Sequence, residues 1–411
     1  MSTVTATGVD ARPDTAAHKA LFASAIGYAM DGFDLLILGF MLRAISADLG
    51  LTPAQAGSLV TWTLIGAVVG GIMFGVLADR YGRVRVLTWT ILLFAVFTGL
   101  CAMAQGYWDL LVYRTIAGLG LGGEFGIGMA LVAEAWPPAK RARACSYVAL
   151  GWQAGVLLAA LITPLLLPVI GWRGMFLVGL VPGVIAFVVR WYVGEPEIFL
   201  AKAKDAAHRA AALPLRLLVK DKATTKVSLG MLILCSVQNF GYYGVMIWMP
   251  SYLSTQFGFK LTQSALWTSV TILGMAIGIF VFGIFADRVG RRPALLTFQA
   301  GAFVSVLVYS QLTGETSLLI GGAIMGLFVN GMLGGYGALL SELYPTEARA
   351  TAENVLFNLG RGVGGFGPLV VGALAVGYGF SVAIALLAVI YLIDIVATLF
   401  LIPERKGAAL E

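Results

Sequence analysis

Residues 75–83 read GVLADRYGR, and residues 283–291, which lie 208 positions further along the chain, read GIFADRVGR. Both stretches follow a long apolar run and keep the same spacing of glycine, aspartate and arginine. The same offset relates a second pattern of glutamate, proline and arginine: Glu134, Pro137 and Arg141, then Glu342, Pro345 and Arg349. Several matches at one constant offset indicate an internal duplication, so the two halves of the chain are expected to share one fold.

The composition indicates a membrane protein. The 411 residues are 59% apolar and 12% charged, whereas soluble domains carry about 25% charged residues. So little charge cannot cover a surface of this size in water. A membrane-spanning helix needs about 20 mostly apolar residues, and twelve stretches meet that requirement: 20–42, 56–77, 86–105, 108–133, 144–168, 174–193, 227–250, 264–285, 294–312, 317–340, 351–375 and 379–402.

The fold class predicted from these spans is an all-α membrane protein, with twelve transmembrane helices in two pseudo-symmetric six-helix bundles. Two such halves around a midplane site are the plan of a transporter. Spans 4 and 10 are rich in glycine, which predicts close helix packing. The expected parts are an N-terminal tail (1–19), a first bundle (20–193), a linker (194–226), a second bundle (227–402) and a C-terminal tail (403–411).

The placement of positive charge predicts the orientation. An even number of spans puts both termini on one side of the membrane. All but five of the 27 Lys and Arg residues then lie on that side; three lie on the other side and two within spans: Arg43, Arg173 and Lys260, then Arg114 and Arg361. Because positive loops stay cytoplasmic, we expect a bacterial inner-membrane protein with both termini in the cytoplasm. The basic linker suggests contact with anionic lipid headgroups rather than with nucleic acid.

At the repeated stretches the chain resembles the major facilitator superfamily. Residues 75–83 match the signature G-x-L-A-D-R-x-G-R of the loop between spans 2 and 3, and residues 283–291 are its copy between spans 8 and 9. A narrower resemblance rests on Asp31-Gly-Phe-Asp34 in span 1, with Arg114 and a glycine-rich span 4. These features are similar to the organic-acid:proton symporters, and most of all to the aromatic acid:proton symporter family.

Ionisable side chains inside spans are functional candidates because burying them is costly. Asp31 and Asp34 lie near the middle of span 1, spaced to share one helix face, and their repeat mates are Asn239 and Tyr242. A desolvated carboxyl group can load and release a proton near neutral pH. We therefore predict proton coupling by both aspartates. The alternative is a pair of structural carboxylates held permanently by an arginine.

Two residues of span 4 join this prediction. The resemblance to sugar:proton carriers implies that Arg114 pairs with Asp34, so that protonation of the aspartate releases the arginine. The alternative is a fixed ion pair that only holds spans 1 and 4 together. Glu124 lies deeper in the same span and is either a second proton relay or a polar wall of the cavity. Asp394 in span 12 is interpreted as a hydrogen-bonding scaffold residue.

Arg361 in span 11 is the predicted substrate anchor. Its guanidinium can bind a carboxylate through two parallel hydrogen bonds, and its repeat mate is Gln153. The alternative is an ion pair with Glu353 or with an acid on another helix. Polar and aromatic side chains in neighbouring spans are predicted to complete the substrate site: Trp152, Gln153, Gln238, Asn239, Tyr242, Tyr243, Asn330 and Asn358.

The charges of the repeated motifs are assigned to gating rather than to substrate binding, because they fall at the cytoplasmic ends of spans. These predicted gating residues are Asp79, Arg83, Glu134, Arg141, Asp287, Arg291, Glu342 and Arg349. Both histidines, His18 and His208, lie outside the spans, which excludes proton coupling by an intramembrane histidine. The sequence contains no nucleotide-binding G-x-x-x-x-G-K-[ST] motif and no metal cluster or catalytic nucleophile pattern.

The sequence therefore predicts a secondary transporter and not an enzyme. We expect a monomer without a cofactor that takes up a small organic carboxylate, aromatic or related, together with protons by alternating access. One alternative is a carrier of another metabolite (lactate, nicotinate, sialate or a sugar) or an exporter. A third class is a membrane sensor that kept the fold but transports nothing.

Overall fold

The computed structural model describes residues 15–191, 194–196, 199–200, 214–407 and 410. The predicted tails and the predicted linker lie partly outside these ranges, and so does His208. Within them the chain is helical and carries no strand. The main helices are α1 (Thr15–Leu49), α2 (Pro53–Tyr81), α3 (Arg83–Cys101), α4 (Tyr107–Ala135), α5 (Arg141–Trp191), α8 (Lys222–Phe257), α9 (Leu261–Val289), α10 (Arg291–Tyr309), α11 (Glu315–Gly331), α12 (Leu333–Leu343), α13 (Arg349–Gly364), α14 (Gly367–Tyr378) and α15 (Phe380–Leu401).

The twelve predicted spans can be traced on these helices. Among the described residues, ten segments are long and apolar enough to cross a membrane. Span 6 is the second arm of α5, which turns at Gly171 through a left-handed φ of 67° that favours glycine. Span 11 is divided into α13 and α14, and span 10 into α11 and α12. The chain is thus a multi-pass membrane protein with the predicted helical architecture.

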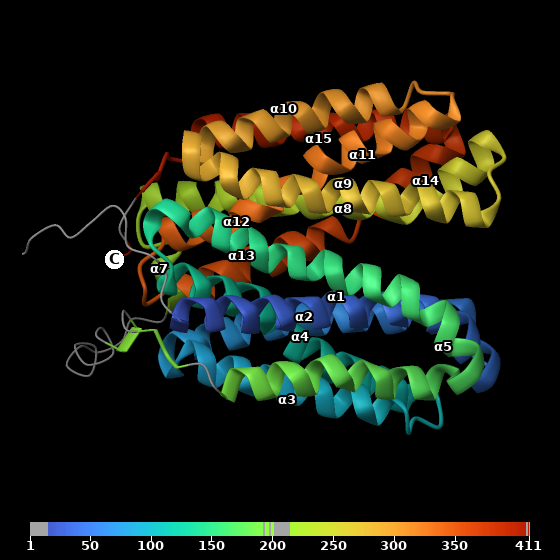
Figure 1. Cartoon of the computed structure of the whole chain (residues 1–411), viewed down its shortest axis with the longest axis horizontal. Helices are drawn as coiled ribbons and strands as arrows, with labels where there is room; N and C mark the ends of the chain where they lie inside the picture. The colour runs from blue at the N-terminus through green and yellow to red at the C-terminus, as the bar shows by residue number, and fades with distance from the viewer. Residues whose placement is uncertain (1–14, 192–193, 197–198, 201–213, 408–409, 411) are drawn as a thin grey trace, which may run out of the picture.

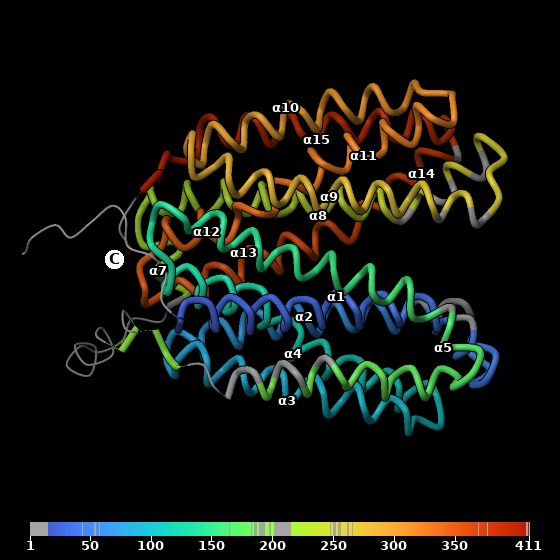
Figure 2. Tube along the Cα trace, viewed as in Figure 1, coloured from blue at the N-terminus to red at the C-terminus, as the bar shows by residue number. Residues whose placement is uncertain are grey.

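The helices run along the long axis of the molecule in two groups, as Figure 1 shows. Helices α1 to α4 lie in the lower group, and α8 to α11, α14 and α15 in the upper one. The tube in Figure 2 follows the same path from blue to red. Helix α1 begins and α15 ends at the same end of the bundle, which we call the rim end. The turns between α2 and α3 and between α9 and α10 lie there too.

Glycine lets the helices of each half approach closely, as predicted for spans 4 and 10. A Cβ atom on Gly122 of α4 would stand 1.9 Å from the carbonyl oxygen of Ala67 on α2. In the second half, a Cβ on Gly326 of α11 would stand 2.3 Å from the carbonyl oxygen of Thr271 on α9. No side chain fits such a gap, so the backbones are in contact at both places.

The repeated motifs make two matching turns at the rim end. Gly82 joins α2 to α3 with a φ of 112°, and Gly290 joins α9 to α10 with a φ of 110°. L-residues with a side chain rarely adopt such values. A glutamate caps the helix that follows each turn: Glu195 accepts the backbone N–H of Arg83, and Glu404 accepts that of Arg291. Both halves therefore cap this helix with a glutamate, although at the offset of the repeat Glu195 matches Pro403 and not Glu404.

The second bundle begins earlier than its apolar run. Helix α8 starts at Lys222, within the segment predicted as linker, and a short helix α7 (Pro214–Leu217) precedes it. The Asp221 carboxylate accepts the backbone N–H of Thr224 at 2.8 Å. This bond satisfies a free donor at the helix start. Backbone hydrogen bonding continues a helix past the apolar residues, so hydropathy alone does not mark this end.

Candidate functional site

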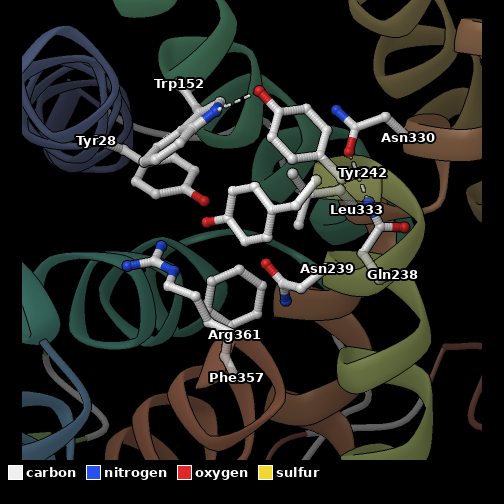
Figure 3. A pocket seen from close by; sticks show the side chains of 10 residues that line it. Tyr28, Trp152, Gln238, Asn239, Tyr242, Asn330, Leu333, Phe357 and Arg361 are labelled. Carbon is white, nitrogen blue, oxygen red and sulfur yellow. Dashed lines mark hydrogen bonds between the residues drawn. The ribbon is translucent and has the colours of Figure 1, made fainter. Parts of the chain in front are cut away.

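A cavity lies between the two halves near their middle. Its walls come from α1, α5, α8, α11, α12 and α13: Tyr28, Trp152, Gln238, Asn239, Tyr242, Tyr243, Asn330, Leu333, Phe357 and Arg361. Figure 3 shows the guanidinium of Arg361 on one side and the amides of Gln238 and Asn330 on the other, with aromatic rings between them. A hydrogen bond joins two of these lining residues across the halves: Trp152 Nε1 on α5 donates to the Tyr242 hydroxyl on α8 at 3.3 Å. The cavity thus combines one cation, several aromatic faces and a group of amides.

Arg361 is buried, with 3% of its surface exposed. Its Cζ atom lies 5.5 Å from the ring centroid of Trp152 and 5.1 Å from that of Phe357. Within the described ranges no carboxylate lies within ion-pair distance of this guanidinium, and its Nε has no hydrogen-bond partner. Aromatic faces attract a cation but do not neutralise it. Glu353, the alternative partner predicted for Arg361, instead accepts a hydrogen bond from the Ser341 hydroxyl.

The amides opposite Arg361 have capacity for a ligand. Gln238 Nε2 donates to Asn330 Oδ1 at 2.6 Å. Among the described atoms, Gln238 Oε1 and Asn330 Nδ2 are buried and lack a partner. The third amide is used locally, since Asn239 Nδ2 donates to the carbonyl oxygen of Cys235 at 2.9 Å. The bonded pair of amides therefore keeps one acceptor, Gln238 Oε1, and one donor, Asn330 Nδ2, without a hydrogen-bond partner.

The predicted substrate residues divide into two groups. Seven of them line the cavity: Trp152, Gln238, Asn239, Tyr242, Tyr243, Asn330 and Arg361. Gln153 and Asn358 are buried but are not lining residues; Asn358 Nδ2 donates to the carbonyl oxygen of Gly122 and so joins α13 to α4. Sequence reasoning missed Tyr28, Leu333 and Phe357. Tyr28 could have been found, because it lies three residues before Asp31 on the same helix face.

Asp34 and Arg114 form a closed pair. Two parallel hydrogen bonds join them, from Nη1 to Oδ1 at 3.0 Å and from Nη2 to Oδ2 at 2.7 Å, and both side chains are fully buried. Arg114 Nε also donates to the Thr63 hydroxyl at 3.3 Å. Bidentate hydrogen bonds between a guanidinium and a carboxylate are strong and directional. The pair links α1 to α4 within the first half, as the family resemblance implied.

The other predicted ionisable residues have separate surroundings. Asp31 is fully buried between Tyr28 and Asp34 in the order of the helix, and Tyr28 interacts electrostatically with both Asp31 and Arg361. Glu124 accepts a 2.6 Å hydrogen bond from the Thr90 hydroxyl. Asp394 accepts one from Gln299 Nε2 at 3.1 Å, between α10 and α15, and is not a lining residue of the cavity. Tyr28, Asp31 and Asp34 thus form a line of polar groups that leads from the cavity to Arg114.

The predicted gating residues meet at the rim end in two clusters. In the first, Asp79 accepts the backbone N–H groups of Ala350 and Thr351 at 3.1 and 2.7 Å, where α13 begins. A carboxylate is favourable at that position because the helix dipole is positive there. Arg83 and Arg349 both donate to Glu134, at 3.0 and 2.6 Å. Arg349 and Glu134 belong to different halves, so this cluster holds the halves together.

The second cluster repeats this arrangement with the halves exchanged. Asp287 accepts the backbone N–H groups of Ala142 and Arg143, where α5 begins. Arg141 and Arg291 donate to Glu342 at 3.0 and 2.8 Å. Between the rim and the cavity, the rings of Phe125 and Phe357 stack across the halves with centroids 3.6 Å apart. These contacts close the path from the rim end to the cavity.

One ion pair lies at the opposite end, outside the spans. Arg173 donates to Asp48 at 2.5 Å, and the Trp172 indole N–H donates to the same oxygen at 3.1 Å. These bonds, that from Arg173 first, lower the pKa of Asp48 below its ordinary value. Both charged side chains are close to half exposed. Water and salt therefore screen the pair.

The duplicated bundles, the closed rim and the central polar cavity define a membrane carrier. The chain belongs to the Major Facilitator Superfamily, whose profile matches residues 24–273 and 252–410. It is therefore a transport protein and not an enzyme. A Haemophilus influenzae protein, whose name specifies metabolite transport but no substrate, is 68% identical over 96% of this chain and 98% of its own length.

Two further likenesses are informative. The cis,cis-muconate transport protein of Acinetobacter baylyi is 30% identical over 92% of both chains, in keeping with the resemblance to organic-acid carriers. The solved structure of the proton:xylose symporter XylE, bound to 6-bromo-6-deoxy-D-glucose, superposes with a TM-score of 0.80 over 97% of this chain and 98% of that chain, at 17% sequence identity. At that identity the second likeness establishes the shared fold alone.

Proposed function

We propose that this protein takes up a small organic carboxylate together with protons by alternating access. The observation that carries the proposal is Arg361, a buried cation in the central cavity without a carboxylate partner among the described residues. Leaving such a charge buried and unneutralised is costly. A substrate carboxylate would supply the missing negative charge, and the planar guanidinium suits it. The relative that carries muconate, an unsaturated carboxylate, supports this substrate class.

The aromatic walls favour a flat substrate body. Trp152 and Phe357 present ring faces to the guanidinium, and Tyr28 lines the same cavity. A planar acid can stack on such rings. The unpartnered Gln238 oxygen and Asn330 nitrogen would receive a second polar group of the substrate. An aromatic or conjugated acid meets these demands better than a neutral sugar, which would leave Arg361 without a counter-charge.

Proton coupling is assigned to Asp34 and Asp31, with Arg114 as the responding group and Glu124 as a further relay. Protonation of Asp34 would break the bidentate pair with Arg114 and free α4 to move relative to α1. The line from Tyr28 through Asp31 to Asp34 connects this event to the substrate cavity. In the expected orientation the rim faces the cytoplasm of a bacterial inner membrane, so the described conformation would face outward. Because one chain contains both halves of the pathway, a monomer suffices.

The test is uptake by the purified protein in proteoliposomes, with aromatic, conjugated and aliphatic acids as candidates and a neutral sugar as control. An inward proton gradient should drive accumulation of one of the acids against its own gradient. The double variant Asp34→Asn with Arg114→Gln keeps the charge balance of the buried pair. We expect it to retain exchange of internal for external acid and to lose gradient-driven accumulation. Wild-type accumulation by this variant would refute the coupling assignment, and an absence of acid flux in the wild type would refute the function.

A further inference from the structure

The two rim clusters are related by the internal repeat but differ in charge. The acidic rim cluster contains Asp79, Glu134, Glu353, Arg83 and Arg349. The basic rim cluster contains Asp287, Glu342, Arg141, Arg143 and Arg291. Each has two matching carboxylates and two matching guanidiniums. The difference arises at two positions, because Glu353 has Cys145 as its repeat mate and Thr351 has Arg143.

Glu353 is the extra acid of the acidic rim cluster. It is fully buried on the second turn of α13. Its Oε1 accepts a hydrogen bond from the Ser341 hydroxyl on α12, and its Oε2 has no partner within the described structure. Asp79 and Glu134 are close enough to interact with it electrostatically, and so is Arg349. Cys145 on α5 also faces it.

The two arginines of this cluster are already neutralised by other acids. Arg349 donates to Glu134 at 2.6 Å, and Arg83 lies 3.0 Å from both Glu134 and Asp79. An ionised Glu353 would make three carboxylates against two guanidiniums in a space closed to water. Like charges at such sites cannot all ionise without a large cost. A neutral Glu353 removes the imbalance.

We infer that Glu353 is a proton-binding site of the rim gate, occupied while the rim is closed and emptied when it opens. Opening would separate α13 from α2 and α4, admit water to Glu353 and allow its carboxyl to ionise. By linkage, proton binding then favours the closed rim. The inference rests on the alternating-access carrier but not on the substrate assigned to Arg361 or on the coupling assigned to Asp34.

This site would make the gate sensitive to pH on the rim side. If the rim faces the cytoplasm, acid brought in with its proton lowers the internal pH, and Glu353 then holds the carrier closed toward that side. Uptake would slow as the product accumulates. The basic rim cluster has no extra acid at the matching position, so the response is assigned to one of the two clusters.

The test measures rim opening without substrate. Hydrogen exchange of the amides at the start of α13, Ala350 and Thr351, reports it because these N–H groups donate to Asp79. After correction for intrinsic exchange, wild-type protection should rise as the pH falls, by up to about tenfold per pH unit for one linked proton. Glu353→Gln mimics the protonated state and should give high protection at every pH. The matched control Asp394→Asn removes another fully buried acid, which bonds Gln299 and belongs to neither rim cluster, and should keep the wild-type pH dependence.

Two results would overturn the inference: a pH dependence in Glu353→Gln like that of the wild type, or its loss in Asp394→Asn. If Glu353→Gln does not fold, the inference is tested instead by following the infrared carboxyl bands of Asp394→Asn as a function of pH. The band of a buried carboxylic acid should disappear over the pH range in which the amide protection falls; a protein without such a band has no protonated acid at the rim. Both measurements are made without substrate, so a failure of this inference is distinguishable from a failure of the proposed function.

Discussion

Arg114 and Arg361 are both buried arginines inside membrane spans, but their surroundings are opposite. Arg114 forms two parallel hydrogen bonds with Asp34 and a third with Thr63. Arg361 has aromatic faces at 5.1 and 5.5 Å and, among the described residues, no carboxylate. The charge of Arg114 is neutralised by a carboxylate of the protein itself, whereas a ligand could neutralise the charge of Arg361. The contrast supports the proposal that Arg114 serves conformational coupling and that Arg361 binds the substrate.

The internal repeat sharpens this contrast. The repeat mate of Asp34 is Tyr242 and that of Arg361 is Gln153, so neither charge is required by the shared fold. The first half therefore contains a buried ion pair, and the second half a buried cation, at positions where the matching residue Tyr242 or Gln153 carries no charge. If both charges serve transport, they should respond differently when removed, in stability and in binding.

The largest expected difference is in stability. Arg114→Ala leaves Asp34 buried without a counter-charge, and breaking a buried pair in this way costs about 3–5 kcal/mol. Arg361→Ala removes a cation that has no carboxylate partner in the described structure, so the free energy of unfolding should stay the same or rise. Thermal unfolding of both variants in one detergent measures the difference. Equal destabilisation would mean that Arg361 also has a structural partner.

The next effect concerns binding. Arg361→Ala should weaken acid binding by about 100-fold, since removal of one partner of a buried charge pair costs about 3 kcal/mol. Arg361→Lys keeps the charge but loses the planar fork, and an intermediate affinity is expected. Isothermal titration of the acid that uptake identifies gives both values. If Arg361→Ala bound the acid with wild-type affinity, the assignment of Arg361 to substrate binding would be refuted.

A smaller effect is expected on the opposite side of the cavity. Asn330→Leu removes the unpartnered amide donor, and one hydrogen bond contributes about 1 kcal/mol, or roughly fivefold in affinity. The loss should affect acids that carry a second polar group and spare acids of the same size that lack one. Competition binding with two such matched acids measures the difference. The same loss for both acids would indicate a change of cavity shape instead of a lost contact.

The sequence predicted the architecture well because its repeat and its apolar runs are independent of side-chain orientation. It also named most of the cavity. It could not tell that Gln153 and Asn358 are not lining residues while Phe357 is. A transmembrane helix is apolar toward lipid and toward its neighbours alike, so periodicity does not reveal which side faces the cavity. Phe357 could not be found for a further reason: its stacking on Phe125 joins helices that are more than two hundred residues apart in sequence.

The smallest effect concerns the exposed counterpart of the Asp34–Arg114 pair. Asp48 and Arg173 have the same chemistry, but both side chains are close to half exposed. The lowered pKa of Asp48 means that its contribution to stability is full above the ordinary value of 3.8 and is lost as the pH falls through the lower, folded-state pKa. Asp48→Asn should therefore lower the melting temperature slightly at neutral pH, and the two proteins should converge in strong acid. High salt should also remove the difference, because exposed pairs are screened. A large loss of melting temperature that persists in high salt would contradict this expectation. It would mean that the Asp48–Arg173 pair is as well shielded from water as the Asp34–Arg114 pair, in spite of its exposure.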